Sequence, residues 1–320
     1  MSRVHKNKLG RSGLQVSALS LGTMNFGADW HKVGAIDDRT ASSLIDLALE
    51  RGVNLIDTAD IYGRGAAEEM LGRLLKGRRK KVLLATKLLG QMELGDDSTG
   101  GLSARWVALA LEGSLKRLKT DHVDLYMPHG WDRGTPIEET LEALDRAMTA
   151  GKVRVLGCSN FSGDQLTQAL GVSVASRRAR FQFDQVQYSL ASRFPESDLV
   201  PVAAREGVGL LAWSPLAGGL LSGKYAATGA SGRRLDADAF PYVEPQRGAA
   251  MVKVLQHVAA LEGRTCAQTA LGWIMGKPFV SSAVLGARTV EQLTELLDAK
   301  PLSARAGLLL DRASEICSRP

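Results

Sequence analysis

Cysteine is scarce in this chain, and long apolar runs are absent. The three cysteines, Cys158, Cys266 and Cys317, lie far apart among 320 residues, so they form neither a disulfide framework nor a CxxC metal pair. No apolar stretch approaches the roughly 18 residues of a membrane span, and the N-terminal MSRVHKNKLG lacks the apolar core of a signal peptide. We therefore expect a soluble cytoplasmic protein that does not enter membranes.

Histidine and clustered charge are also sparse. Five histidines with no HxH pair argue against a metal-dependent hydrolase, so we predict no metal site. The net charge of +6 is scattered, and the one dense basic run, KGRRKK at 76–81, has no interleaved aromatic residues. This run is typical of a solvated loop, and we predict no binding of nucleic acid.

What the sequence does contain is a repeated alternation of apolar, β-branched runs with helical periodicity. Eight such runs are predicted strands, centred near Leu19, Leu55, Leu84, Leu125, Val155, Val186, Leu211 and Val284. Eight strand–helix units in about 300 residues favour an α/β fold of the closed (β/α)₈ TIM-barrel type. We expect residues 1–320 to form one such domain, with the segment HKNKLGRSGLQVS as an N-terminal β-hairpin plug.

Two further patterns refine this prediction. A doubly wound sheet that binds a dinucleotide typically has the motif GxGxxG after an early strand. In GRGAAE at 63–68 a glutamate occupies the position of the third glycine, so this segment does not fit that motif. Long connections follow the third strand (88–106) and the seventh strand (222–247). Long loops at one end of a barrel usually cover a ligand.

Polar residues follow the predicted strands at one end of the barrel. Asp57, Lys87 and His129 come at the ends of strands two, three and four, and Tyr62 begins the next helix. Each alone is typical of a turn, a surface charge or loop packing, but together they suggest acid catalysis. A lysine ammonium, oriented by Asp57, is expected to lower the pKa of Tyr62, and His129 would orient a carbonyl.

A hydride must then come from a cofactor. The flat face of Trp213 suits a nicotinamide ring, although core packing is an equal alternative, and Ser159, Asn160 and Gln185 suit its carboxamide. After the eighth strand, GARTVEQLTELL opens a helix, and its amides together with Arg288 suit a phosphate.

The chain resembles the aldo-keto reductase superfamily, in particular its bacterial branch related to potassium-channel β subunits. The motifs that carry the resemblance are DTADIYG, ATK, VDLYMPHGWD, GCSNF, QVQYSL, WSPLAGGLLSGKY and GARTVEQL, in family order. The resemblance implies an NADPH-dependent carbonyl reductase with Tyr62 as general acid, tuned by Lys87 and Asp57, and with His129 orienting the carbonyl.

The resemblance also implies a cofactor site. Its residues would be Gly22, Thr23, Ser159, Asn160, Gln185, Trp213, Ser214, Leu216, Gly218, Lys224, Gly286, Arg288, Gln292 and Glu295. Gly286 stands where the superfamily usually has a basic residue, so the preference for NADPH depends mainly on Arg288. Leu296 replaces a frequent asparagine near the adenine.

Two other functions stay open on the sequence alone. A regulatory or sensor subunit would keep the same four residues and bind NADPH with little turnover. A Schiff-base lyase would use Lys87 as a neutral nucleophile, which the nearby Asp57 opposes. Phe26, Trp30 and Trp131 are predicted to line a pocket for apolar, cyclic or aryl carbonyls or the matching alcohols, with packing as the alternative. The substrate, the direction of reaction and the oligomeric state are not determined by the sequence.

Overall fold

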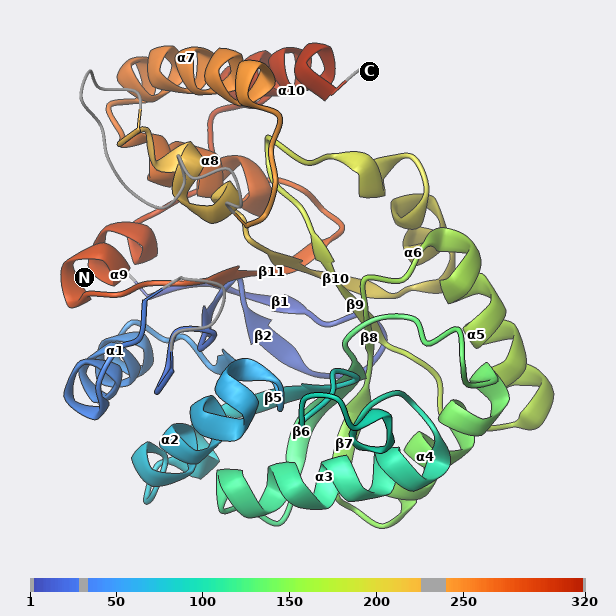
Figure 1. Cartoon of the computed structure of the whole chain (residues 1–320). Coiled ribbons are helices and arrows are strands. Elements are labelled where there is room, and N and C mark those ends of the chain that lie inside the picture. The colour runs from blue at the N-terminus through green and yellow to red at the C-terminus, as the bar shows by residue number, and fades with distance from the viewer. Residues whose placement is uncertain (1–2, 29–33, 226–239, 319–320) are drawn as a thin grey trace.

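Eight parallel strands close into a barrel around which the helices are arranged (Figure 1). The computed structural model describes residues 3–28, 34–225 and 240–318. Each predicted strand is confirmed, and the observed strands are β3 (Leu19–Gly22), β4 (Leu55–Asp57), β5 (Leu83–Leu88), β6 (Val123–Pro128), β7 (Val153–Leu156) with β8 (Cys158–Ser159), β9 (Phe183–Gln187), β10 (Gly209–Trp213) and β11 (Val280–Leu285).

The barrel closes at Gly157, where one strand is divided into β7 and β8. β7 pairs with β6 and β8 pairs with β9, and these two elements are the ends of the nine-member strand order. A Cβ atom on Gly157 would lie 2.3 Å from the Phe183 ring. A glycine at this position therefore lets the aromatic ring pack against the bend.

Helices cover the outside of the barrel because each presents one apolar stripe to the strands. The helices are α1 (Asp38–Glu50), α2 (Ala66–Leu74), α3 (Ala104–Leu118), α4 (Ile137–Thr149), α5 (Gly163–Ser176), α6 (Leu199–Glu206), α7 (Pro245–Glu262), α8 (Cys266–Met275), α9 (Val290–Leu297) and α10 (Ala304–Ser318). α8 follows the seventh barrel strand, whereas α7 and α10 pack side by side outside the ring (Figure 1). The buried apolar residues of strands and helices form one large cluster between these layers.

The predicted hairpin plug is present. β1 (Lys6–Lys8) pairs antiparallel with β2 (Gln15–Ser17). Leu9 and Val16 are fully buried in a second cluster together with residues that point into the barrel, among them Leu55, Phe183 and Leu211. The hairpin therefore closes the end of the barrel where the strands begin, and it leaves their carboxyl ends for a site.

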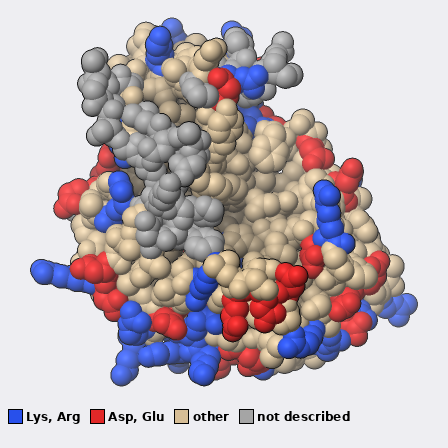
Figure 2. Space-filling view, viewed as in Figure 1, with Lys and Arg blue, Asp and Glu red and all other residues tan. Residues whose placement is uncertain are grey.

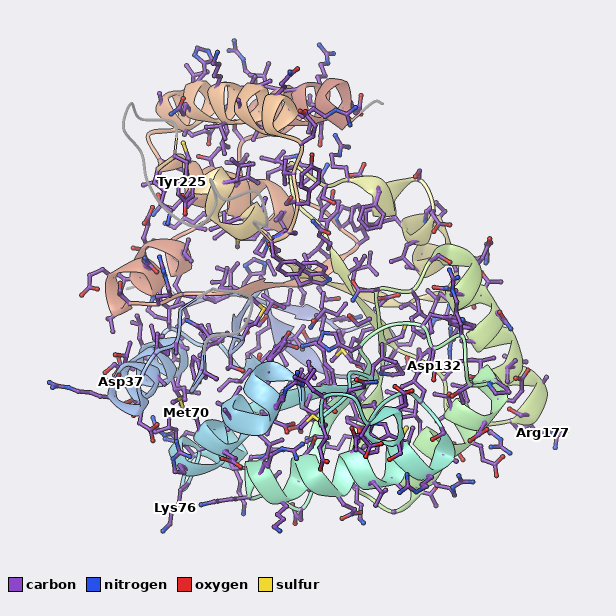
Figure 3. The ribbon with its side chains drawn as sticks, in the orientation of Figure 1. Asp37, Met70, Lys76, Asp132, Arg177 and Tyr225 are labelled. Carbon is purple, nitrogen blue, oxygen red and sulfur yellow. The ribbon has the colours of Figure 1, made fainter. Side chains whose placement is uncertain are left out.

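Long loops follow β5 and β10, as the sequence predicts. The first holds the short helix η3 (Asp97–Thr99), and the second holds η5 (Ala217–Ser222). The basic run at 76–81 lies between α2 and β5; Lys76 lies at the periphery of the molecule (Figure 3). Arg78 and Arg79 in this run pair with Asp46 and Asp124. Among the described residues, no helix is both long and apolar enough to cross a membrane.

Candidate active site

Three strand tips bring four of the predicted side chains together. Asp57 ends β4, Lys87 lies near the end of β5, and His129 follows β6. Tyr62 begins η1 (Tyr62–Gly65), the short helix that precedes α2. Lys87 Nζ lies 2.7 Å from Asp57 Oδ2 and 3.3 Å from Tyr62 Oη. The rings of Tyr62 and His129 meet edge to face, with their centroids 5.8 Å apart.

Lys87 is fully buried and completely surrounded by acceptors. Its ammonium donates to Asp57, to the Thr58 carbonyl at 2.8 Å and to Tyr62. Burial lowers the pKa of Lys87, but the Asp57 carboxylate and the Tyr62 oxygen outweigh burial, so the net pKa is raised. Lys87 is therefore a cation rather than a free amine, and this opposes the Schiff-base alternative.

The pKa of Tyr62 corrects one expectation. Lys87 favours the phenolate, as the sequence suggested, but burial of the phenol is the larger effect, and the pKa of Tyr62 is raised from its ordinary value. The sequence places the Lys87 charge near Tyr62, which lowers the pKa of the phenol. It does not show how deeply the phenol is buried, and burial raises that pKa more than the charge lowers it. Tyr62 therefore holds its proton at neutral pH.

His129 is a neutral imidazole at physiological pH. Burial lowers its pKa to about 3, and the Lys87 ammonium adds to the effect. Its backbone is fixed between two neighbouring strands, because its amide donates to the Leu88 carbonyl and its carbonyl accepts from Asn160 Nδ2 at 3.0 Å. The ring is thus held beside Tyr62 as an uncharged hydrogen-bonding group.

The predicted amide-binding residues form a connected chain. Trp213 Nε1 donates to Asn160 Oδ1 at 2.8 Å, and Asn160 Nδ2 also reaches Ser159 Oγ at 3.0 Å. Gln185 Nε2 donates to Asp57 Oδ1 at 2.7 Å. Ser159 is fully buried and donates to the Gln185 carbonyl, so it lies behind the cavity wall and supports the residues that face it.

These residues surround a cavity of about 580 Å³ at the carboxyl ends of the strands. Figure 2 shows a hollow near the middle of this face, and the described residues beside it are largely uncharged. The predicted residues that line it are Gly22, Thr23, Asp57, Tyr62, His129, Asn160, Gln185, Trp213, Ser214, Leu216, Gly218, Lys224, Gly286, Arg288, Gln292 and Glu295. Lys87 and Ser159 are buried just behind this wall.

The loop after β10 has an unusual backbone at this cavity. Ser214, Ala217, Gly218 and Gly219 all adopt the left-handed conformation, and Ser214 Oγ accepts from the Gly218 amide at 3.0 Å. Lys224 lies over the ring of Tyr225, which Figure 3 places beside α8. Such a conformation turns consecutive amides away from regular hydrogen bonding and is typical of functional loops.

A second cation reaches the same cavity from the start of α9. Thr289 caps this helix by accepting from the Gln292 amide, and Gln292 Oε1 accepts from the Arg288 amide at 3.0 Å. Arg288 is exposed and lines the cavity. Lys224 and Arg288 therefore bring two positive charges to the part of the cavity formed by the later elements.

The structure corrects the prediction for the pocket aromatics. Phe26 is only 1% exposed and packs in the apolar cluster outside the barrel. Trp131 stacks edge to face on Phe161 at 5.1 Å and is not among the residues that line the cavity. Trp30 lies outside the described residues. The apolar character of an aromatic residue in a loop does not show whether its ring lines the cavity or packs in the core.

Several residues that line the cavity were not predicted from the sequence. They are Met24, Asn25, Ile61, Pro215, Gly219, Ser222, Tyr225, Phe240, Pro241, Ala267, Val284 and Leu285. Phe240 stacks parallel on Trp213, with centroids 5.7 Å apart and an interplanar angle of 6°. Met24 and Ile61 are next to motif residues in the sequence, so their place at the cavity could have been predicted. Phe240 comes from a distant part of a long loop, and no local pattern indicates its place.

Comparisons with known proteins agree with this geometry. A profile described as the aldo/keto reductase family matches residues 18–311. YrpG, an uncharacterized oxidoreductase of Bacillus subtilis (strain 168), is 39% identical over 305 residues, covering 92% of this chain and 90% of that protein. A probable voltage-gated potassium channel subunit beta of Oryza sativa subsp. japonica is 35% identical over 316 residues, covering 93% of this chain and 92% of that protein.

Proposed function

The chain belongs to the aldo/keto reductase family of oxidoreductases, and we propose that it is an NADPH-dependent reductase of aldehydes and ketones that also oxidises the matching alcohols. One observation carries the proposal. The Tyr62 hydroxyl lies at the wall of a large cavity, within 3.3 Å of a buried ammonium that a carboxylate holds at 2.7 Å. This arrangement supplies a proton at one point of the cavity wall.

The residues present fit NADPH. A volume of about 580 Å³ lies within the usual range of small-molecule sites, about 300–1,000 Å³. Arg288 and Lys224 would hold phosphate groups, and the left-handed loop at Ser214 to Gly219 would hold the pyrophosphate. Trp213, Asn160 and Gln185 would hold the nicotinamide, and Glu295 would face the adenine. When bound, NADPH supplies the hydride that the carbonyl carbon accepts.

The side chains of the chain itself carry the proton chemistry. Tyr62 donates its proton to the carbonyl oxygen of the substrate as negative charge develops there. Lys87, which stays charged, stabilises the phenolate that remains, and Asp57 keeps the ammonium in place. The neutral His129 ring, next to Tyr62, positions the carbonyl oxygen without competing for the proton.

The cavity wall near this centre indicates the substrate class. Met24, Ile61 and Phe240 are apolar residues that line the cavity together with Tyr62 and His129. Apolar walls with few polar groups select ligands by shape and apolar area. We therefore expect apolar, cyclic or aryl carbonyl compounds to be better substrates than charged ones.

The test is NADPH consumption with a panel of aryl aldehydes, dicarbonyls and cyclic ketones, for the wild type and for Tyr62→Phe. Loss of the general acid is expected to lower kcat by about 10²–10⁴-fold, while NADPH binding, followed by fluorescence, stays intact. Tyr242→Phe is the matched control because Tyr242 is 71% exposed and does not line the cavity. Equal activity in Tyr62→Phe and the wild type would disprove the assigned role.

A regulatory subunit is the second candidate, and the similarity to the rice protein described as a probable potassium channel β subunit supports it. Such a subunit would bind NADPH in the same cavity and turn over slowly. Tight NADPH binding without reduction of any carbonyl in the panel would favour this function over the enzyme. Absence of NADPH binding would contradict both.

A further inference from the structure

Behind Tyr62 and Lys87 lies a second buried polar cluster that the proposed chemistry does not use. It lies between the barrel wall and helices α2 and α3. Its members are Thr58, Asp60, Glu68, Thr86, Arg117 and Tyr126, and all except Arg117 are fully buried. Asp60 adjoins the active site directly, because its amide donates to the Lys87 carbonyl at 3.2 Å.

The cations near Asp60 already have carboxylate partners. Arg117 Nε binds Glu68 Oε2 at 2.8 Å, and Glu68 Oε1 accepts from Thr86 Oγ1 at 2.6 Å. Lys87 is paired with Asp57 at 2.7 Å. Two cations and two carboxylates cancel, so an ionised Asp60 would add one uncompensated negative charge.

Asp60 itself lacks hydrogen-bond partners. Among the described residues, neither of its carboxyl oxygens has a hydrogen-bond partner, and the hydroxyls of Thr58 and Tyr126 are likewise unpaired. A buried carboxylate that has no cation of its own and no hydrogen bond to either oxygen is costly, so the protonated form is favoured. Consistent with this, burial and the Glu68 charge raise the pKa of Asp60 well above its ordinary value, against the smaller effects of Arg117, the Ile61 amide and Lys87.

The charged and titratable groups that face Asp60 come from four elements: Glu68 from α2, Arg117 from α3, Lys87 from β5 and Tyr126 from β6. Tyr62 follows two residues later in the chain. A negative charge on Asp60 disfavours the phenolate, and it is one of the influences that raise the pKa of Tyr62. The charge state of Asp60 therefore bears on how readily Tyr62 gives up its proton.

We propose that Asp60 is a positioning residue that keeps its proton at neutral pH and, by staying uncharged, keeps Tyr62 acidic enough to protonate the carbonyl oxygen. The charge state of Asp60 stands on the cluster alone, whereas its effect on the reaction rests on the proposed function. When Asp60 ionises at higher pH, Tyr62 becomes a weaker acid, and carbonyl reduction slows.

The first test detects the proton on the Asp60 carboxyl directly. Infrared spectra at a series of pH values are expected to contain a carboxylic-acid C=O band that disappears in Asp60→Asn. Asp184→Asn is the matched control, because Asp184 is another buried carboxyl with a raised pKa, about 7, and lies on β9. Its substitution should remove a different band. Absence of any band assignable to Asp60 at pH 7 would overturn the proposal, whatever the enzyme reduces.

The second test measures the titration of the Tyr62 hydroxyl and does not require catalytic turnover. The ¹³Cζ signal of Tyr62, assigned with Tyr62→Phe, is expected to titrate at lower pH in Asp60→Asn than in the wild type. Identical titration in both proteins would overturn the coupling. If Asp60→Asn does not fold, Glu68→Gln replaces it. This variant removes the repelling charge and frees Arg117, so the Asp60 band should disappear at lower pH than in the wild type.

The third test is the pH profile of kcat at saturating NADPH. Asp60→Asn is expected to match the wild type at low pH within about threefold and to lack the part of the alkaline decline that ionisation of Asp60 causes, so that only the decline from ionisation of Tyr62 itself remains. Equal loss of activity at every pH would indicate a merely structural role and overturn the proposal. Absence of turnover in the wild type would instead contradict the proposed function, and the infrared and titration results would still decide the charge state of Asp60.

Discussion

At the scale of single residues, the candidate active site contains buried charges that compensate each other. The side chains of Lys87 and Asp57 are 0% and 3% exposed, and each is the counter-ion of the other. The same low-dielectric surroundings hold the proton on Tyr62 and keep His129 neutral. Removing one charge should therefore affect stability as well as catalysis.

Lys87→Met is expected to lower the free energy of unfolding by about 3–5 kcal/mol, because it leaves the Asp57 carboxylate buried without a counter-ion. Denaturant titration measures this loss. The double variant Lys87→Met/Asp57→Asn should recover part of the stability but none of the carbonyl reduction. A double variant less stable than Lys87→Met would contradict the explanation by an unpaired charge.

His129 should make folding depend on pH in a defined direction. Below about pH 6.5 the unfolded chain takes up a proton on this imidazole, whereas the folded protein does so only near pH 3. The folded state therefore loses stability from this residue as the pH falls through that window. His129→Asn should reduce the difference in free energy of unfolding between pH 7 and pH 5. An unchanged difference would show that His129 is not held neutral.

At the scale of elements, the division of one barrel strand into β7 and β8 depends on packing that the strand pattern does not show. Gly157 separates the two segments, and its amide donates to the Tyr126 carbonyl at 3.0 Å. Ser159 and Asn160 follow, and they donate to the carbonyls of Gln185 and His129 at the cavity. The bend therefore connects barrel closure to the site.

Gly157→Ala is expected to destabilise the protein by about 1–3 kcal/mol through overpacking, since the new methyl group would meet the Phe183 ring. Thermal unfolding measures the change, and Phe183→Leu in the same chain should restore part of it. Gly171→Ala in α5 is the matched control, because its Cβ would meet nothing within 4 Å. That substitution should stabilise by about 0.5–1 kcal/mol.

The start of α9 should determine the choice between the two nicotinamide cofactors. Arg288→Ala is expected to raise the Kd for NADPH by about 10–100-fold, the value of one charge-assisted hydrogen bond or ion pair, and to leave NADH binding unchanged. Fluorescence titration with both cofactors measures this. Arg305→Ala in α10, another exposed arginine that does not line the cavity, should change neither. Equal weakening of both cofactors would assign Arg288 another role.

At the scale of the whole molecule, residues 1–320 are predicted to unfold as one domain. Far-ultraviolet circular dichroism and tryptophan fluorescence should report coincident transitions. The tryptophans sample separate regions: Trp106 in α3, Trp213 at the end of β10, and Trp273 in α8, where it donates to Asp311 of α10 at 2.8 Å. Two separated transitions would contradict a single domain.

Much of this architecture was predictable because its signals are local. Each barrel strand is a short apolar run between turns, and the eight runs matched β3 to β11. Strand tips of parallel units meet at one end of a barrel, so the sequence alone predicts that Asp57, Tyr62, Lys87 and His129 converge. The family motifs supplied the predicted cofactor positions, nearly all of which line the cavity.

Periodicity and motif spacing run along the chain, so the sequence alone was enough to predict the strands and to propose the residues of the site. Only the tertiary structure decided how strongly those residues are desolvated, and hence that the pKa of Tyr62 is raised rather than lowered. The packing also sets that Phe26 lies away from the cavity, that Phe240 covers Trp213, and that neither carboxyl oxygen of Asp60 has a hydrogen-bond partner among the described residues. Burial and charge balance are sums over neighbours that are distant in sequence, so no local pattern contains them.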